Sequence, residues 1–246
     1  MQEKLDIGIV IPCYNEEQNF LHTRYRSFLE TNSNTVICFV NDGSTDHTLN
    51  ILTNLGKEFA NHVVILNLKT NSGKAEAVRQ GIHHLNNLHS LNKIGFIDAD
   101  LAVSLEESIQ IAALIQDPIV MAFGSRISKV GSHIDRQFHR FIIGRFIATI
   151  ISNILDLKVY DTQCGCKFFS LEESKELFKK PFITKWLFDV ELFFRMQKSY
   201  GKQDYQYKMY EAPLKRWVDR GDSKVKFSYG FKVFFDLLSI RNAYKK

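Results

Sequence analysis

The 246-residue sequence predicts an α/β fold with a mostly parallel, Rossmann-like sheet covered by helices on both faces. Two observations carry this prediction. Short apolar runs alternate with helical patterns through the first half, and polar clusters follow the runs where parallel strands would end. The expected strands are residues 7–11, 36–40, 63–68, 94–97 and 120–123.

Helical patterns fill the gaps between these strands. Apolar residues recur there at helical spacing, as in the set Val78, Ile82 and Leu85. The second half is expected to be mainly helical, with helices near residues 136–155, 172–180, 186–199 and 227–243 and one clear strand within 205–214. No repeat or linker interrupts the chain, so we expect a single domain over residues 1–246.

Composition limits the class of protein. The apolar content of 45% is that of a globular protein, and no segment approaches the roughly 20 apolar residues of a membrane span. The first residues are acidic where a signal peptide is basic. The four cysteines have neither zinc spacing nor an evident pairing, so a reducing, cytosolic setting is expected. The glycine patterns of dinucleotide dehydrogenases and P-loop NTPases are missing.

Positive charge is concentrated in two places. Residues 201–246 hold eleven Lys and Arg against five Asp and Glu, and a second cluster lies within residues 126–145. Basic regions of this kind suit phosphate, nucleic acid or an anionic membrane surface. A solvated basic face explains them equally well.

Asp98 and Asp100 directly follow the apolar run 94–97. Carboxylates at the end of a buried strand are costly to bury unless a cation or hydrogen-bond donors meet them. Mg²⁺ or Mn²⁺ carrying a diphosphate meets that need, since hard cations take carboxylate and phosphate oxygens. The alternative is a solvated turn with an aspartate cap.

Further polar segments follow the other early strands, at residues 12–16, 41–46 and 71–74. Ligands of open α/β sheets gather at the carboxyl ends of the strands. Taken one at a time, each segment is explained as a turn, a helix cap or a loop glycine, but together they predict a binding site at one edge of the sheet.

Four ordered segments, residues 11–16, 40–46, 71–78 and 98–100, together resemble family-2 glycosyltransferases of the GT-A fold. Downstream, residues 123–126, 161–167, 186–192 and 221–224 resemble the dolichyl-phosphate glucosyltransferases and bacterial polyprenyl-phosphate glycosyltransferases. Those relatives usually carry a membrane-spanning helix, for which this sequence shows no candidate. The resemblance divides the domain into a nucleotide-sugar half, 1–125, and an acceptor half, 126–246.

The resemblance implies a role for particular residues on the donor side. Pro12, Tyr14 and Glu16 would help form the nucleotide pocket, Asp42 would contact the base or ribose, and Lys74 would follow the loop beside the base, as a direct contact or as a positional residue. Asp98 would contact the ribose or the metal region, and Asp100 would bind the metal. A basic loop would close over the diphosphate, with Arg220, Lys224 or Lys226 as candidates; plain surface lysines are the alternative.

On the acceptor side, Arg126, Arg136 and Arg140 are the candidates for a lipid phosphate, because arginine forms bidentate contacts with phosphate. The very apolar segment 138–154 is either a core helix or an interfacial helix that lies in the headgroup region. The resemblance of segment 161–167 implies that Gln163 is one of the catalytic residues. Asp189 or Glu191 would be the base if the acceptor were a hydroxyl.

We therefore expect an inverting, metal-dependent enzyme that moves a hexose, glucose from UDP-glucose first among the candidates, onto a polyprenyl or dolichyl phosphate. It would act peripherally at the cytoplasmic face of the membrane, without a nucleic-acid partner. One alternative is the same fold acting on a hydroxyl of a soluble or cell-surface glycan. Another is a nucleotide-binding protein without transferase activity.

Overall fold

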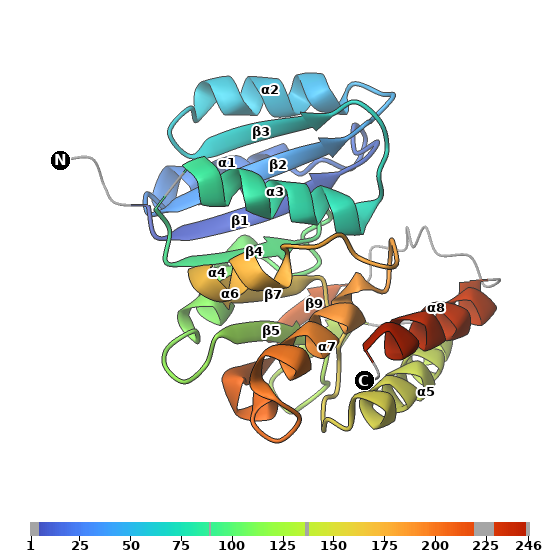
Figure 1. The fold of residues 1–246 in the computed structure, drawn as a ribbon. Helices are drawn as coiled ribbons and strands as arrows, with labels where there is room; N and C mark the ends of the chain where they lie inside the picture. The colour runs from blue at the N-terminus through green and yellow to red at the C-terminus, as the bar shows by residue number, and fades with distance from the viewer. Residues whose placement is uncertain (1–4, 89, 136–137, 219–228, 245–246) are drawn as a thin grey trace.

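A computed structural model describes residues 5–88, 90–135, 138–218 and 229–244. Its centre is a seven-stranded sheet with the order β3-β2-β1-β4-β7-β5-β8 (Figure 1). The strands are β1 (Ile7–Cys13), β2 (Thr35–Asp42), β3 (Val63–Leu68), β4 (Lys93–Ile97), β5 (Met121–Ser125), β7 (Cys166–Ser170) and β8 (Met209–Pro213). The mostly parallel sheet and all five early strands are confirmed, with boundaries shifted by no more than two residues.

β7 is the one antiparallel member of the sheet. It lies between β4 and β5 and runs against both, while the remaining neighbours are parallel. The predicted strand within 205–214 is confirmed as β8, whereas β7, which also comes from the second half, was not predicted. Two further short strands, β6 (His133–Asp135) and β9 (Arg216–Val218), pair with each other in a separate small sheet.

Helices cover both faces of the sheet. One face packs against α3 (Lys74–Leu88), α6 (Leu171–Leu177) and α7 (Phe188–Tyr200), and the other against α1 (His22–Thr31), α2 (Thr48–Glu58) and α4 (Leu105–Ala113). The apolar pattern of α3 explains which face of this helix packs on the sheet, because Val78, Ile82 and Leu85 are all fully buried there.

The local sequence also sets where two helices begin. α4 and α6 each begin within the sequence Ser-Leu-Glu-Glu, with the serine as N-cap, and in each the serine hydroxyl accepts a hydrogen bond from the backbone N–H three residues on. This N-cap satisfies one of the N–H groups that a helix leaves unpaired at its start. The two glutamates also suit the positive end of the helix dipole.

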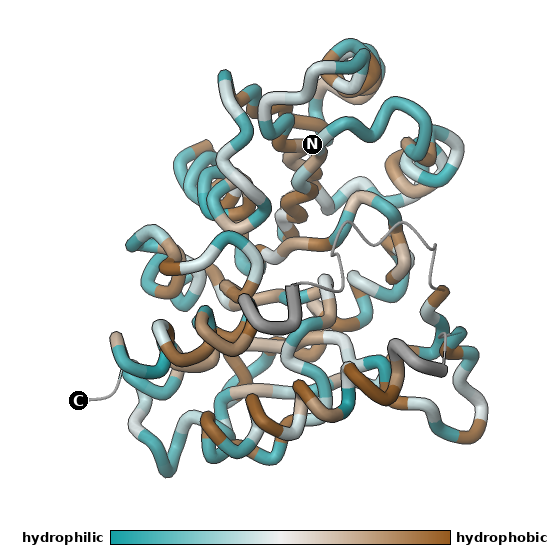
Figure 2. The backbone as a smooth tube through the Cα atoms, turned by 90° about the vertical axis from the view of Figure 1, so that its right-hand side faces the viewer, coloured by the Kyte–Doolittle hydropathy of each residue, from teal (hydrophilic) through white to brown (hydrophobic). Residues whose placement is uncertain are grey.

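α5 (Phe138–Leu155) and α8 (Tyr229–Tyr244) lie next to each other in both views of the chain (Figures 1 and 2). Each is only partly buried. Ile151 and Leu237 belong to the core, whereas Phe146 and Phe235 are 69% and 64% exposed. Within the described part of the chain, no helix combines the length and the apolar character needed to span a bilayer.

All four cysteines are buried, and no disulfide joins any two of them. Burial raises the pKa of the Cys38 and Cys164 thiols to about 12, so both stay protonated at neutral pH. The cysteines therefore pack as small apolar side chains.

The direction of the strands brings the predicted site together. β1 to β5 end at the same edge of the sheet, and the antiparallel β7 begins there. The loops after β1, β2, β4 and β5, the start of α3 and the loop before β7 therefore share one edge.

Candidate active site

The loops after β1 and β2 are joined into one unit by hydrogen bonds. Asn15, which has a positive φ of 52°, donates its N–H to Ser44 Oγ (3.1 Å) and accepts at Oδ1 from the N–H of Thr45 (2.9 Å). The N–H of Glu16 donates to Thr48 Oγ1 (2.8 Å). These contacts fix the backbone around the predicted nucleotide-pocket residues, of which Pro12 is half-buried and Tyr14 is 36% exposed.

Asp42 shapes the loop that leads into α3. The side chain is buried, and its two oxygens accept from the N–H groups of Ser72 (2.7 Å) and Gly73 (2.9 Å). The neighbouring Gly43 has a φ of 64° and lies so close to the backbone of Asn71 that a Cβ would not fit. Asp42 therefore has a structural task at the predicted donor site, and its contact with base or ribose stays a prediction.

Lys74, the first residue of α3, pairs with Asp98 at the end of β4. The distance from Lys74 Nζ to Asp98 Oδ1 is 2.5 Å, and both side chains are partly accessible. Burial alone would lower the pKa of Lys74, but the carboxylates of Asp98, Asp189 and Asp100 outweigh it and raise that pKa. The lysine is therefore a cation among three carboxylates, two from the loop after β4 and one from α7.

Asp98 is held close to the loop before β7. Its N–H donates to the carbonyl of Gly165 (3.1 Å), and a Cβ on Gly165 would collide with the carboxylate of Asp98. Glycine is thus the only residue that leaves space for this carboxylate. Asp100 lies in the turn that follows, where its Oδ1 accepts from the N–H of Ala102 (2.9 Å).

A buried ion pair beneath α7 is the feature that the sequence analysis missed. Lys167, the second residue of β7, is fully buried and donates to Asp189 Oδ1 (2.6 Å) and to the carbonyl of Cys164 (2.6 Å). Its ammonium lies 5.7 Å from the centre of the Phe96 ring. A lone lysine in the apolar run 164–169 was the available signal, since a buried ammonium requires an acidic partner.

Arg126 forms the third pair, with Asp161. Two guanidinium nitrogens meet the two carboxylate oxygens, Nε at 2.6 Å and Nη2 at 2.8 Å, and Trp217 lies 5.5 Å from the guanidinium. Burial alone would raise the pKa of Asp161, but Arg126 outweighs it and holds that pKa well below its usual 3.8. The N–H of Gln163 donates to the same carboxylate (3.1 Å), so this pair also fixes the loop that carries Gln163.

The remaining predicted residues fall into two groups. Glu191 is fully buried and is engaged by Arg195, Tyr244 and the N–H of Ile183, so it is unavailable as the base considered for a hydroxyl acceptor. Arg136 and the predicted basic loop with Arg220, Lys224 and Lys226 lie outside the described residues, and of Arg140 only the backbone, within α5, is described.

The donor set limits how a metal could bind. Among the described residues, no three His, Cys, Asp or Glu side chains converge in a way that could hold an ion. Asp98 and Asp100 supply at most two carboxylates at this edge of the sheet. Such a pair suits a hard divalent cation only when a further oxygen ligand, such as a phosphate, completes the shell.

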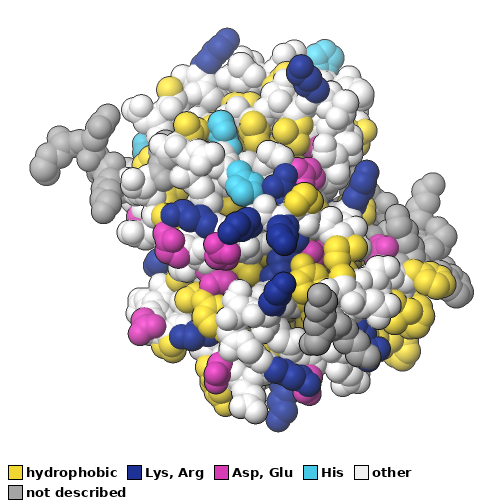
Figure 3. Space-filling model, viewed as in Figure 1, with side chains coloured by type: hydrophobic (Ala, Val, Ile, Leu, Met, Phe, Trp, Pro, Cys, Tyr) yellow, Lys and Arg dark blue, Asp and Glu magenta, His cyan; other side chains and the backbone are white. Residues whose placement is uncertain are grey.

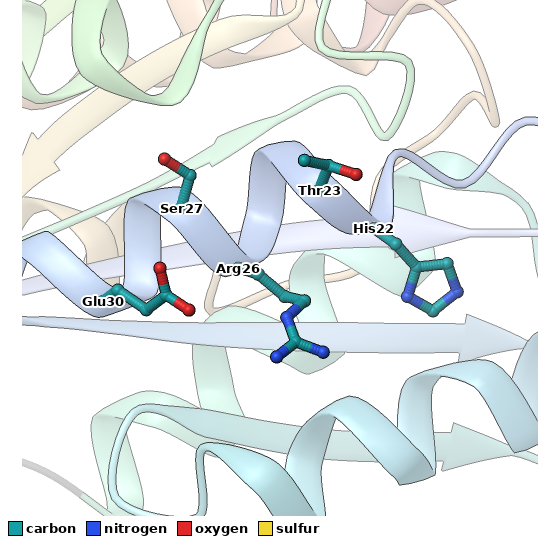
Figure 4. Close-up of a pocket in the computed structure, with 5 residues that line it drawn as sticks. All are labelled: His22, Thr23, Arg26, Ser27 and Glu30. Carbon is teal, nitrogen blue, oxygen red and sulfur yellow. The ribbon is translucent and has the colours of Figure 1, made fainter.

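A shallow depression elsewhere on the surface is not part of this site. Its lining residues, His22, Thr23, Arg26, Ser27 and Glu30, all lie on α1 (Figure 4). Arg26 is itself paired with Glu58 of α2 at 2.6 Å. A hollow lined by one exposed helix face offers none of the convergent groups found at the strand ends.

Comparison with known proteins agrees with this arrangement. The pattern of glycosyl transferase family 2 matches residues 8–178. A dolichyl-phosphate beta-glucosyltransferase of Trichomonas vaginalis is 28% identical over 97% of this chain and 74% of its own length. The dolichyl-phosphate beta-glucosyltransferase of Saccharomyces cerevisiae is 30% identical over 98% of this chain and 76% of its own length.

Solved structures show the same fold. Glucosyl-3-phosphoglycerate synthase from Mycobacterium tuberculosis, in complex with Mn²⁺, UDP-glucose and phosphoglyceric acid, matches with a TM-score of 0.68 at 17% identity, over 97% of this chain and 80% of that one. Mannosyl-3-phosphoglycerate synthase from Rubrobacter xylanophilus matches with a TM-score of 0.69 at 12% identity, over 96% and 73%. The chain belongs to glycosyl transferase family 2: it is a glycosyltransferase of the GT-A fold, related along nearly its whole length to the dolichyl-phosphate beta-glucosyltransferases.

Proposed function

We propose that this glycosyltransferase moves glucose from UDP-glucose onto the phosphate of a polyprenyl or dolichyl lipid, with inversion at the anomeric carbon. The observation that carries the proposal is the three ion pairs at one sheet edge, Lys74–Asp98, Lys167–Asp189 and Arg126–Asp161. The similarity to dolichyl-phosphate beta-glucosyltransferases over both halves of the chain supports this choice of donor and acceptor.

On the donor side, the joined loops after β1 and β2 form the proposed nucleotide pocket. Tyr14 offers an accessible ring beside the backbone fixed by Asn15, and Pro12 and Glu16 flank it. Asp42 holds the loop of Ser72 and Gly73 that leads to Lys74, which carries a positive charge toward the diphosphate.

Asp100 and Asp98 are the proposed residues for a divalent metal. Their carboxylates suit Mg²⁺ or Mn²⁺, and the diphosphate of the donor would complete an incomplete protein donor set. When bound, the metal offsets the negative charge that develops on the leaving diphosphate. Asp98 is also held by Lys74, so Asp100 is the stronger of the two proposed ligands.

On the acceptor side, two features favour a phosphate over a hydroxyl. A phosphate is already an anionic nucleophile and needs no base, and Asp189, the candidate base, is tied to Lys167 at 2.6 Å. Arg126 uses its Nε and Nη2 on Asp161 and has further N–H groups that could meet an acceptor phosphate. Gln163 would lie beside the reacting groups on the loop that Asp161 fixes.

The test is transfer of radiolabelled glucose from UDP-glucose to a polyprenyl phosphate with Mn²⁺ or Mg²⁺. We expect the label to move into the organic phase on solvent extraction and to be released by a β-glucosidase, because inversion of the α-linked donor gives a β-linked product. Label that stays in water on a glycan would favour a hydroxyl acceptor. Thermal stabilisation by UDP without any turnover would contradict transferase activity on these substrates.

We also propose that α5 and α8 rest on an anionic membrane surface at the cytoplasmic face. Hydrophobic side chains gather at the edge of the molecule where these helices lie (Figure 3), and Ile142, Ile143 and Phe146 on α5 and Phe234 and Phe235 on α8 are all more than 40% exposed. Apolar side chains on partly buried helices are typical of interfacial binding.

Liposome sedimentation tests the membrane proposal. The protein should bind anionic vesicles at low salt and release them as salt rises. Replacing Phe146 and Phe235 with serine should weaken binding, whereas the same change at Leu88, an exposed residue at the end of α3, should have no effect. Equal binding by both variants would contradict the assignment to α5 and α8.

A further inference from the structure

Lys74 lies where a metal-bound diphosphate is proposed to arrive. Its Nζ is 2.5 Å from Asp98 Oδ1, and Asp100 and Asp189 are close enough to act on its charge. The ammonium also lies 5.9 Å from the centre of the Phe188 ring, in the same segment of α7 as Asp189. Residues from α3, β4 and α7 thus converge on one cation.

Formal charges show what this cation does to the site. Asp98, Asp100 and Asp189 carry three negative charges, and Lys74 and Lys167 carry two positive ones, which leaves one net negative charge. A divalent ion alone would reverse the sign of this cluster. A divalent ion together with the two charges of a nucleotide-sugar diphosphate would leave it unchanged.

We infer that Lys74 is an internal counter-ion that makes metal binding depend on the donor. The inference rests on the proposed donor site. Before the donor binds, the ammonium of Lys74 is paired with the carboxylate of Asp98 and repels a divalent cation that arrives without the diphosphate. When metal and diphosphate enter together, the diphosphate becomes a new partner for the ammonium of Lys74. The carboxylate of Asp98 can then turn to the metal while Lys74 stays paired with the diphosphate.

A simpler role for Lys74 makes a different prediction. If Lys74 only donates a hydrogen bond to a phosphate, its removal weakens nucleotide binding equally with and without metal. As a counter-ion, it must change the factor by which metal and nucleotide strengthen each other's binding. By linkage that factor is the same whichever ligand is titrated, and coupling factors of this kind are roughly 5–150-fold.

The experiment measures this factor by calorimetry on wild type and Lys74→Met. Mn²⁺ is titrated with and without UDP, and UDP with and without Mn²⁺, with the Mn²⁺–UDP complex in solution included in the fit. The wild type should bind Mn²⁺ weakly alone. Lys74→Met should bind Mn²⁺ alone at least about tenfold more tightly, and its coupling factor should fall by about tenfold.

Two further variants separate the counter-ion role from a general loss of charge or of structure. Lys74→Arg keeps the charge and should keep the coupling factor. Lys185→Met removes a charge from the neighbouring loop, where its side chain packs against Gly73, and should leave the factor close to wild type. If Lys74→Met is less stable than the wild type, Lys74→Gln takes its place, and the same changes in Mn²⁺ affinity and coupling factor are expected.

A coupling factor that is unchanged in Lys74→Met, or that falls equally in Lys185→Met, would overturn the inference. So would a wild type that binds Mn²⁺ alone as tightly as Lys74→Met does. Failure of the wild type to bind UDP with Mn²⁺ would instead overturn the donor site itself.

Discussion

Replacing Lys167 with methionine should destabilise the protein strongly, because it leaves the carboxylate of Asp189 without its cation. The Lys167 side chain is fully buried and that of Asp189 is 7% exposed, so water cannot replace the lost partner. The variant also leaves the carbonyl of Cys164 without the ammonium that donates to it at 2.6 Å.

The size of the effect follows from this burial. Removing one member of a buried ion pair costs roughly 3–5 kcal/mol. In a chain of this length, each kcal/mol lowers the melting temperature by about 2–4 °C, so we expect a decrease of roughly 6–20 °C. Asp189→Leu alone should cost a similar amount, because it leaves the ammonium of Lys167 unpaired among Phe96 and its neighbours.

A double-mutant cycle in urea provides the test. The Lys167→Met, Asp189→Leu double variant should be clearly more stable than the sum of the two single effects predicts, since the apolar pair leaves no buried charge behind. Additivity within about 0.5 kcal/mol would show that the two groups do not stabilise each other and would refute the reasoning.

Three further outcomes follow from the same edge of the sheet. Asp100→Asn should lower transfer by about a thousandfold or more while the fold survives, as measured by initial rates and circular dichroism; a variant within tenfold of wild type would contradict its proposed metal role. Gly165→Ala should lower transfer by about tenfold or more, because the added methyl displaces the carboxylate of Asp98, whereas Gly144→Ala, where the methyl meets no atom within 4 Å, should not. Asp161→Asn should cost about 3 kcal/mol at pH 7. Folding lowers the pKa of Asp161, so the stability difference between wild type and Asp161→Asn should stay constant down to the usual aspartate pKa of 3.8 and shrink as the pH falls further. Urea unfolding of both proteins at pH 7, 5, 4 and 3 measures this difference.

The parts of the fold that the sequence predicts well are those that local patterns determine. The strands of the first half are continuous apolar runs bounded by turn residues, and β3 has the predicted bounds, Val63–Leu68. The gathering of Asp42, Lys74 and Asp98 at one edge follows from parallel strand direction alone.

What the sequence does not predict depends on contacts between distant residues. β7 escapes notice because Lys167 interrupts its apolar run, and the carboxylate that makes this lysine acceptable is 22 positions away, on α7. Glu191 resembles a candidate base until the hydroxyl of Tyr244, 53 positions away, is seen to engage it, whereas its pair with Arg195 is a local contact four positions along α7. Arg126 was predicted as a phosphate ligand, and its fork on Asp161 depends on a loop 35 positions away.

The place of β7 in the sheet limits how this enzyme could be divided or recombined. Its strand comes from the second half of the chain, yet it is hydrogen-bonded to β4 and β5 from the first half. A fragment of residues 1–125 would therefore have two unfilled strand edges in the middle of its sheet, both apolar and prone to self-association. Chimeric enzymes with exchanged acceptor specificity should instead keep β7 with its sheet and exchange the segment between β5 and β7 together with the core residues that Ile151 and Leu155 of α5 pack against.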